Sequence, residues 1–313
     1  MICWGGDLGN SIFMLLTGYF MVKRQVNWQR IFLLVSTMTL YSWVSMIIAY
    51  SGNFATFSLK GFLKGAFPLL FGEYWFLSCY VIFSVFIPFV NTFLNNLTKK
   101  QYFLYLMLFF LMLSILPAFK INTYFNAGIL FFGLSYSIGG YIKLYGDTFL
   151  NEKWHRKCGL YFLIMLILLW ASILFMDGFG ILYHHDIFIR NAYRWQAIFS
   201  IPMSVTLFIY FLTRPCFYRG YINTIAGTVL GIYLIHDNDF MRPIIWGYIF
   251  PNSDWIYSGW FPLFLVVKVL GVFAVCSFIE LLRKRLLDKK FNKVWDWLLA
   301  NVYPKVDKLR YFI

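Results

Sequence analysis

The side chains best suited to chemistry lie in one short segment around residue 236. His236 ends the apolar run Gly231–Ile235 and is followed directly by Asp237 and Asn238. An imidazole beside a carboxylate is suited to carrying a proton, because its ordinary pKa lies close to neutrality. A histidine that simply satisfies its hydrogen bonds at a membrane boundary explains the same residues, so both interpretations stay open.

A second candidate is Glu73, which stands directly before Tyr74 and Trp75 at the start of another apolar run. Aromatic residues are common where a helix meets the membrane surface, and this accounts for Tyr74 and Trp75. A carboxylate is less expected there. Glu73 therefore predicts contact with a polar substrate or a polar cavity.

Two arginines, Arg24 and Arg30, flank a short connection between apolar runs. A guanidinium group can bind phosphate through two parallel hydrogen bonds, which favours a phosphorylated ligand. Anchoring at the inner membrane surface explains the same arginines. In the preceding run, Asn10 and Tyr19 place polar groups where close helix contact is an alternative to ligand binding.

The composition restricts the elements that can position these residues. Of the 313 residues, 61% are hydrophobic and 13% are charged. Such sparse charge cannot cover a soluble surface, and such high hydrophobicity excludes a disordered chain. The five cysteines are scattered and show no CxxC spacing, so neither a zinc site nor a disulfide framework is expected. No nucleotide-binding or metalloprotease motif occurs.

Long apolar runs without alternation predict an all-α, polytopic membrane helix bundle. Nine candidate transmembrane spans cover approximately 8–22, 30–50, 75–92, 102–118, 125–145, 158–176, 195–213, 222–236 and 260–282. The first and eighth are short and contain glycine, so we expect them to be tilted, broken or buried by neighbouring helices.

The basic residues orient these spans. With the N-terminus outside, 20 of the 27 lysines and arginines fall on the inner side, where such residues concentrate. The other seven are Lys60, Lys64, Lys120, Arg190, Arg194, Arg242 and the intramembrane Lys268. His155 lies among inner-side cations and is interpreted as part of that charge. The sequence thus divides into a membrane domain, 1–282, and a basic, aromatic cytoplasmic tail, 283–313, on the inner leaflet. The net charge of +14 then needs no nucleic-acid partner.

Several short segments resemble, in order, the acyltransferase type 3 family of bacterial membrane proteins. Residues 9–13 and 17–20 are similar to its second helix, and Arg24 and Arg30 stand where the family carries a basic motif. Residues 75–77 resemble its outer WFL segment, 139–141 a GGY-type element, and 231–236 its YLIH signature.

The resemblance implies a ten-helix fold whose first helix carries a catalytic histidine. This sequence lacks that helix, and a truncated or misassigned start at Met1 is the favoured explanation, with a degenerate, inactive relative as the alternative. The catalytic base is therefore unknown, and His236 and Glu73 are the candidates within the chain.

The family further implies O-acylation, most often acetylation, of a cell-surface polysaccharide or lipid-linked glycan in the bacterial plasma membrane. Acetyl-CoA or another acyl-CoA is the expected co-substrate, with no bound cofactor and no metal. The expected substrate- and cofactor-binding residues are Arg24, Arg30, Asn10, Tyr19, Trp75, Tyr233 and Asn238. A transporter for glycans or lipids remains a further alternative.

Overall fold

The computed structural model describes residues 5–118, 128–148, 150–151, 153–182, 186–251, 255 and 257–307. The regular structure in these ranges is helical throughout, and they contain no strand, as the absence of alternation predicted. The elements are α1 (Gly5–Met21), α2 (Trp28–Ser51), α3 (Leu59–Ala66), α4 (Trp75–Asn95), α5 (Lys99–Phe110), η1 (Leu111–Ile115), α6 (Leu116–Ala118), α7 (Gly128–Tyr145), η2 (Gly146–Thr148), α8 (Trp154–Leu182), α9 (Asp186–Leu212), α10 (Gly220–Ala226), α11 (Val229–His236), η3 (Pro243–Ile249) and α12 (Phe261–Asp307).

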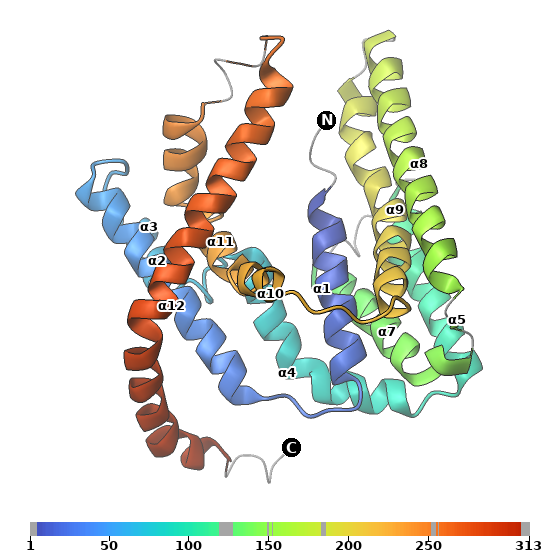
Figure 1. The fold of residues 1–313 in the computed structure, drawn as a ribbon, viewed down its shortest axis with the longest axis horizontal. Helices are drawn as coiled ribbons and strands as arrows, with labels where there is room; N and C mark the ends of the chain where they lie inside the picture. The colour runs from blue at the N-terminus through green and yellow to red at the C-terminus, as the bar shows by residue number, and fades with distance from the viewer. Residues whose placement is uncertain are drawn as a thin grey trace. The chain divides into compact units, whose positions relative to one another are not determined.

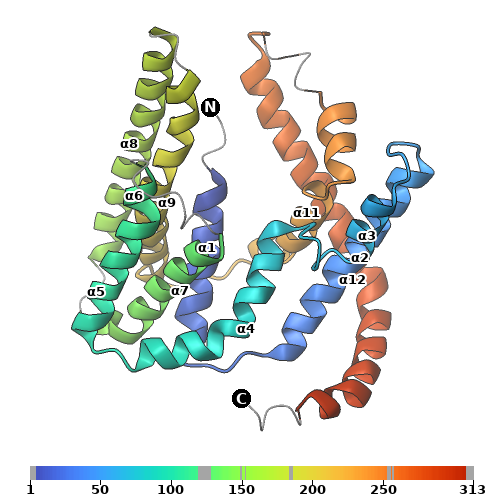
Figure 2. The ribbon, with the colours of Figure 1, turned by 180° about the vertical axis from the view of Figure 1, so that it is seen from behind.

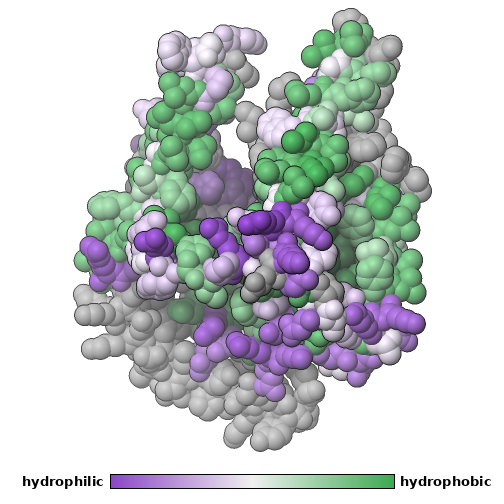
Figure 3. Space-filling view, turned by 45° about the vertical axis from the view of Figure 1, so that its right-hand side comes forward, coloured by the Kyte–Doolittle hydropathy of each residue, from purple (hydrophilic) through white to green (hydrophobic). Residues whose placement is uncertain are grey.

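Four helices in the described ranges are long and apolar enough to cross a membrane. They are Trp28–Ser51, Trp75–Asn95, Trp154–Leu182 and Phe261–Leu286, and a shorter apolar helix covers Ile198–Leu212. Hydrophobic side chains occupy much of the surface visible in Figure 3. Exposed apolar surface on this scale is unfavourable in water and is the surface that a lipid environment accepts.

Two of the predicted spans are interrupted in their hydrogen-bonding pattern. The predicted span 102–118 is formed by α5, a five-residue π-helical turn and α6. The predicted span 222–236 is divided into α10 and α11 at Gly227 and Thr228, where the Thr228 hydroxyl donates to the Ile225 carbonyl at 2.7 Å. Of the outcomes expected for the two short spans, the eighth is broken, while the first forms one continuous helix, α1.

The chain forms two compact units. The first comprises residues 1–26 and 79–216, and the second comprises 27–78 and 217–313. In the first unit α8 and α9 lie side by side, and α1 packs against α7 and α9 (Figures 1 and 2). Gly18 and Gly139 lie at the contact of α1 with α7. A Cβ on Gly18 would collide with the Tyr136 backbone, and one on Gly139 with the Leu15 backbone.

In the second unit, α11 packs against α12 and α2, and α3 packs against α2. Its apolar core includes Met38, Tyr74, Leu234 and Cys276. Helix α12 continues without interruption to Asp307, so the helix extends into the predicted cytoplasmic tail.

Candidate functional site

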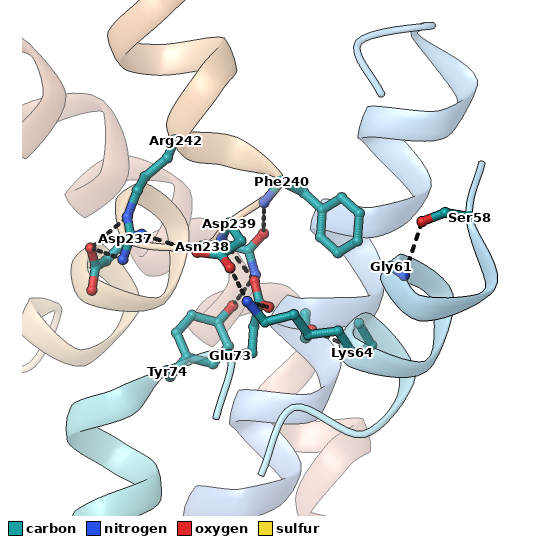
Figure 4. Close-up of polar contacts among 12 residues, drawn as sticks. Ser58, Gly61, Lys64, Glu73, Tyr74, Asp237, Asn238, Asp239, Phe240 and Arg242 are labelled. Atoms are coloured by element: carbon teal, nitrogen blue, oxygen red, sulfur yellow. Dashed lines mark hydrogen bonds and ion pairs between the residues drawn. The ribbon is translucent and has the colours of Figure 1, made fainter. Parts of the chain in front are cut away.

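The second unit brings the segment before α4 together with the turn after α11. We call the residues that meet there the Glu73 cluster: Lys64, Glu73, Tyr74, Asn238 and Asp239 (Figure 4). Two of them, Glu73 and Asn238, are candidate site residues from the sequence. Helix α3 supplies Lys64 from its last turn.

Glu73 is the buried charge of this cluster, with 3% of its surface exposed. Its Oε1 accepts the backbone N–H of Asp239 at 2.7 Å, and Oε2 lies 3.5 Å from the Lys64 ammonium. Burial raises the pKa of the Glu73 carboxyl above its ordinary value, as does the nearby Asp239 carboxylate. The Asp239 N–H and Lys64 oppose this shift without cancelling it.

Lys64 bridges two carboxylates, because it also forms an ion pair and hydrogen bond with Asp239. Burial lowers the pKa of Lys64, but the Asp239 and Glu73 carboxylates outweigh that effect and the net shift is upward. Lys64 therefore stays protonated and keeps the two acids in contact.

Tyr74 fixes the same turn from the neighbouring position and is fully buried. Its hydroxyl donates to the Leu234 carbonyl at 3.0 Å and accepts from the Asn238 amide at 2.8 Å. The Asn238 Oδ1 in turn accepts the Phe240 N–H at 2.9 Å. Burial raises the pKa of Tyr74, so the phenol stays neutral.

Arg242 closes the exposed side of the turn. Its Nε and Nη2 donate to Asp237 Oδ1 at 3.0 and 2.8 Å, and its Nη1 donates to Asp239 Oδ1 at 3.0 Å. The Asp237 carboxylate predicted beside His236 is thus paired with Arg242 (Figure 4).

His236 is half-buried at the end of α11. Its Nδ1 lies 2.6 Å from the Ile232 carbonyl. A carbonyl oxygen only accepts, so Nδ1 carries the hydrogen and, in the neutral ring, Nε2 is the acceptor. The imidazole meets the Trp246 indole edge-to-face at 6.2 Å, and the Lys268 ammonium lies 5.0 Å from the centre of that indole.

Two further predicted residues lie beside this cluster. The Tyr233 ring contacts Tyr74 and Phe76, with ring centres 5.9 and 6.1 Å apart. Trp75 begins α4, and 46% of its surface is exposed while its ring meets Phe76 edge-to-face. The structure therefore groups Glu73, Tyr233, His236 and Asn238 around one turn, with Trp75 next to it in the chain.

The predicted basic pair is divided between the two units. Arg30 belongs to the second unit, where it is exposed in the first turn of α2 and its N–H is capped by Asn27. Asn10, Tyr19 and Arg24 belong to the first unit. The Arg24 backbone is tied to α4 by an Asn91 amide that donates to the Arg24 and Met21 carbonyls.

The first unit also contains a half-open cavity of about 570 Å³ at the C-terminal end of α1. Tyr19, the predicted ligand-binding residue, lines it, together with polar residues from two connections. These are Asp147, Asn151, His155, Thr213 and Arg214.

The partners that hold the candidate residues do not stand out in the sequence. Lys64 and Asp239 are ordinary polar residues in the sequence, and only the fold places both against Glu73. A second missed group is Glu280, 2% exposed within α12, which accepts from the Tyr41 hydroxyl and pairs with Arg283 at 2.7 Å. An acid inside the last apolar span is a signal that could have identified Glu280.

Comparisons with known proteins found one family. Residues 6–280 match a family model, Acyl_transf_3, described as an acyltransferase domain. No curated protein and no solved structure matches the chain. Within the described residues, no group of three or more histidine, cysteine, aspartate and glutamate side chains could hold a metal ion.

Proposed function

The chain belongs to the acyltransferase type 3 family, and we propose that it is a membrane O-acyltransferase that moves an acetyl group from acetyl-CoA to a sugar hydroxyl. The acceptor in this proposal is a cell-surface polysaccharide or a lipid-linked glycan. The observation that carries it is the anchored turn after α11: the Nδ1 of His236 is bonded to the Ile232 carbonyl, which leaves Nε2 as the acceptor, and the buried Glu73 holds the backbone N–H of Asp239 in the same turn.

In the proposed step the sugar hydroxyl attacks the thioester carbonyl. The new C–O bond forms, the C–S bond breaks, and the thiolate leaves as coenzyme A after taking up a proton. His236 Nε2 accepts the hydroxyl proton and returns it to the thiolate, which is general acid–base catalysis by one group. Donors near the carbonyl would stabilise the oxyanion, and we assign this role to the Trp75 indole and the Tyr233 hydroxyl.

Glu73 is a positioning residue in this scheme. Its side chain is buried and holds the Asp239 N–H, so it acts on the reaction through the 236–239 turn. Lys64 and Tyr74 support the same turn. Loss of Glu73 should therefore disturb the orientation of His236 and leave donor binding intact.

We also propose that nine spans cross the membrane with the N-terminus outside and the C-terminus in the cytoplasm. Four helices meet the length and composition for a span, and further support comes from contacts between predicted loops. Glu73 and Asp239, both assigned to the outer side, share a hydrogen bond. Lys99 and Thr148, both assigned to the inner side, are hydrogen-bonded at 2.7 Å.

The donor enters from the cytoplasm in this topology. Arg24 and Arg30 are exposed cations at the connection between α1 and α2, which the topology places on the inner side. We assign them to the 5′-diphosphate of acyl-CoA, as distinct from its ribose phosphate, because guanidinium groups bind phosphate in a bidentate fork. Asn10 and Tyr19 of α1 and Asn238 are assigned to the substrates.

The test is acyl transfer by the purified chain in lipid nanodiscs with radiolabelled acetyl-CoA and bacterial polysaccharide. His236→Gln should reduce the transfer rate about 100-fold or more, while the affinity for acetyl-CoA stays within about twofold of wild type. Tyr248→Phe, at an exposed ring in η3, is the control and should transfer normally.

Other outcomes would replace the proposal. If the folded chain neither binds acyl-CoA nor transfers an acyl group, it is an inactive relative. Uptake of a glycan or lipid into vesicles without acyl-CoA would identify a transporter. Full activity of His236→Gln would leave the family activity standing and overturn the assignment of the base.

A further inference from the structure

The cavity of the first unit is lined by both apolar and polar residues. The apolar and aromatic ones include Tyr19, Ile142, Leu150 and Leu212. The hydrogen-bonding ones include Asn151, His155, Thr213 and Arg214. Its volume of about 570 Å³ lies within the range of small-molecule sites, about 300–1,000 Å³. A ligand with one flat or apolar part and one polar part fits this division.

Exposed cations lie on the segments that form the cavity. Lys143, Lys153 and Lys157 are exposed there, and the Lys143 ammonium lies 4.9 Å from the centre of the Tyr19 ring. Asp147 is the carboxylate in the lining. The excess of cations favours an anionic ligand.

The start of α8 adds to this preference. Helix α8 is 29 residues long and begins at Trp154, between the lining residues Asn151 and His155. The N-terminus of a helix carries a partial positive charge and free backbone N–H groups, which favour phosphate. Arg214 supplies a guanidinium from the connection after α9, a group suited to phosphate recognition.

We infer that this cavity binds the phosphorylated adenosine end of the acyl-CoA donor. The inference rests on the proposed function and names a site for one part of its co-substrate. The adenine ring lies against the apolar and aromatic lining residues, and the ribose phosphate lies at His155, Thr213 and Arg214. The topology proposed above places these residues on the cytoplasmic side, where acyl-CoA is available.

An anionic phospholipid headgroup could also supply a phosphate to this cavity, but it has no adenine ring. The experiment therefore uses adenosine 3′,5′-bisphosphate, which has the adenosine, the 3′-phosphate and the first 5′-phosphate of coenzyme A and no acyl chain. Binding to the full chain is measured by calorimetry in nanodiscs of neutral lipid, and again in nanodiscs that contain anionic phosphatidylglycerol.

Arg214→Gln and His155→Gln should each weaken binding of the bisphosphate, the arginine variant about tenfold or more. Arg156→Gln is the matched control, because Arg156 is an exposed arginine next to His155 that does not line the cavity. It should change the affinity less than about twofold. Thermal unfolding of each variant confirms that the fold is kept, and His155→Gln serves as the second test if Arg214→Gln does not fold.

Three results would overturn the inference. Unchanged affinity in both lining variants would place the nucleotide elsewhere. Binding of acetyl-CoA without binding of the bisphosphate would exclude recognition through the nucleotide, while the proposed transfer reaction still stands. Loss of bisphosphate binding in anionic nanodiscs, with no dependence on Arg214, would identify a lipid site. Failure of the proposed function can be distinguished from failure of this inference. It would appear as no acetyl transfer in the activity assay, whether or not the bisphosphate binds.

Discussion

The backbone N–H of Asp239 donates a 2.7 Å hydrogen bond to Oε1 of the buried Glu73 side chain. This bond joins two segments that are 166 positions apart in the sequence. Both segments carry residues with candidate chemical roles, and the bond fixes the turn that follows His236. A charged acceptor makes such a bond stronger than one between neutral groups.

Glu73→Gln should change how stability depends on pH. The folded state raises the pKa of Glu73, so it binds the proton more tightly than the unfolded chain does. The Glu73 contribution to stability therefore falls as pH rises from the ordinary value of 4.5 through the raised pKa. Glutamine cannot ionise, so the variant should lose this part of the pH dependence.

The measurement is the thermal unfolding midpoint of both proteins in detergent between pH 4.5 and pH 8. As pH rises, the unfolding midpoint of the wild type should fall relative to that of the variant. Parallel curves for the two proteins would show that Glu73 titrates with the same pKa in both states.

Tyr74→Phe should destabilise the second unit. The substitution removes the hydroxyl that donates to the Leu234 carbonyl and accepts from the Asn238 amide, both in a buried environment. Leaving these partners unsatisfied should lower the free energy of unfolding by about 1–3 kcal/mol. Tyr218→Phe, at an exposed ring, should change it by less than about 0.5 kcal/mol. Equal unfolding curves for the two variants would contradict this assignment.

The sequence predicted the all-helical fold because hydrophobic runs have a direct physical cause in the thickness of a bilayer. It also singled out Glu73 and His236, since a charged or titratable residue at the end of an apolar run is costly and stands out. The glycine content and short length of the eighth predicted span indicated a tilted, broken or buried helix, and the fold divides it at Gly227 and Thr228.

The partners of these residues could not be predicted in the same way. Lys64 was one of several outer-side cations, and its contact with Glu73 depends on how α3 packs beside α2. The sequence favours inner-side charge for His155, yet in the fold His155 lines a cavity together with Tyr19 of α1 and Arg214 after α9. Contacts between side chains that are far apart in the sequence depend on tertiary packing, and local patterns in the sequence do not reveal that packing.

Gly18→Ala should disrupt the packing of α1 on α7. A Cβ at Gly18 would collide with the Tyr136 backbone, and backbone atoms cannot rotate away as a side chain can. The two helices must separate, which we expect to cost about 1–3 kcal/mol. Gly9→Ala on the same helix is the matched control, because a Cβ there meets nothing within 4 Å. Alanine at Gly9 should be neutral or stabilise by up to about 1 kcal/mol, and a similar loss in both variants would point to helix propensity instead of packing.

Lys64→Met should destabilise the second unit more at high pH than at low pH. The Lys64 ammonium lies 3.5 Å from Glu73 Oε2 and also pairs with Asp239, so its loss leaves the buried Glu73 without that cation. Asp239 keeps Arg242 at 3.0 Å, which confines the main effect to Glu73.

The pH dependence follows from the protonation of Glu73. Lys64 lowers the pKa of Glu73, so the variant raises it further and favours the neutral acid. At acidic pH, below the raised pKa of Glu73, the protonated carboxyl needs no cation, and the loss of stability should be small. At pH 8 the carboxylate is ionised in the unfolded chain but disfavoured in the folded one, and the loss should reach about 1–2 kcal/mol, since Lys64 is partly exposed.

Two controls make this prediction specific. Lys60→Met removes an exposed lysine from the same helix and should leave stability nearly unchanged at both pH values. In a Glu73→Gln background, Lys64→Met should lose most of its extra cost at pH 8, because the neutral amide no longer needs a cation. A cost that stays the same at pH 5 and pH 8, or persists in that background, would assign the role of Lys64 to its pairing with Asp239 alone.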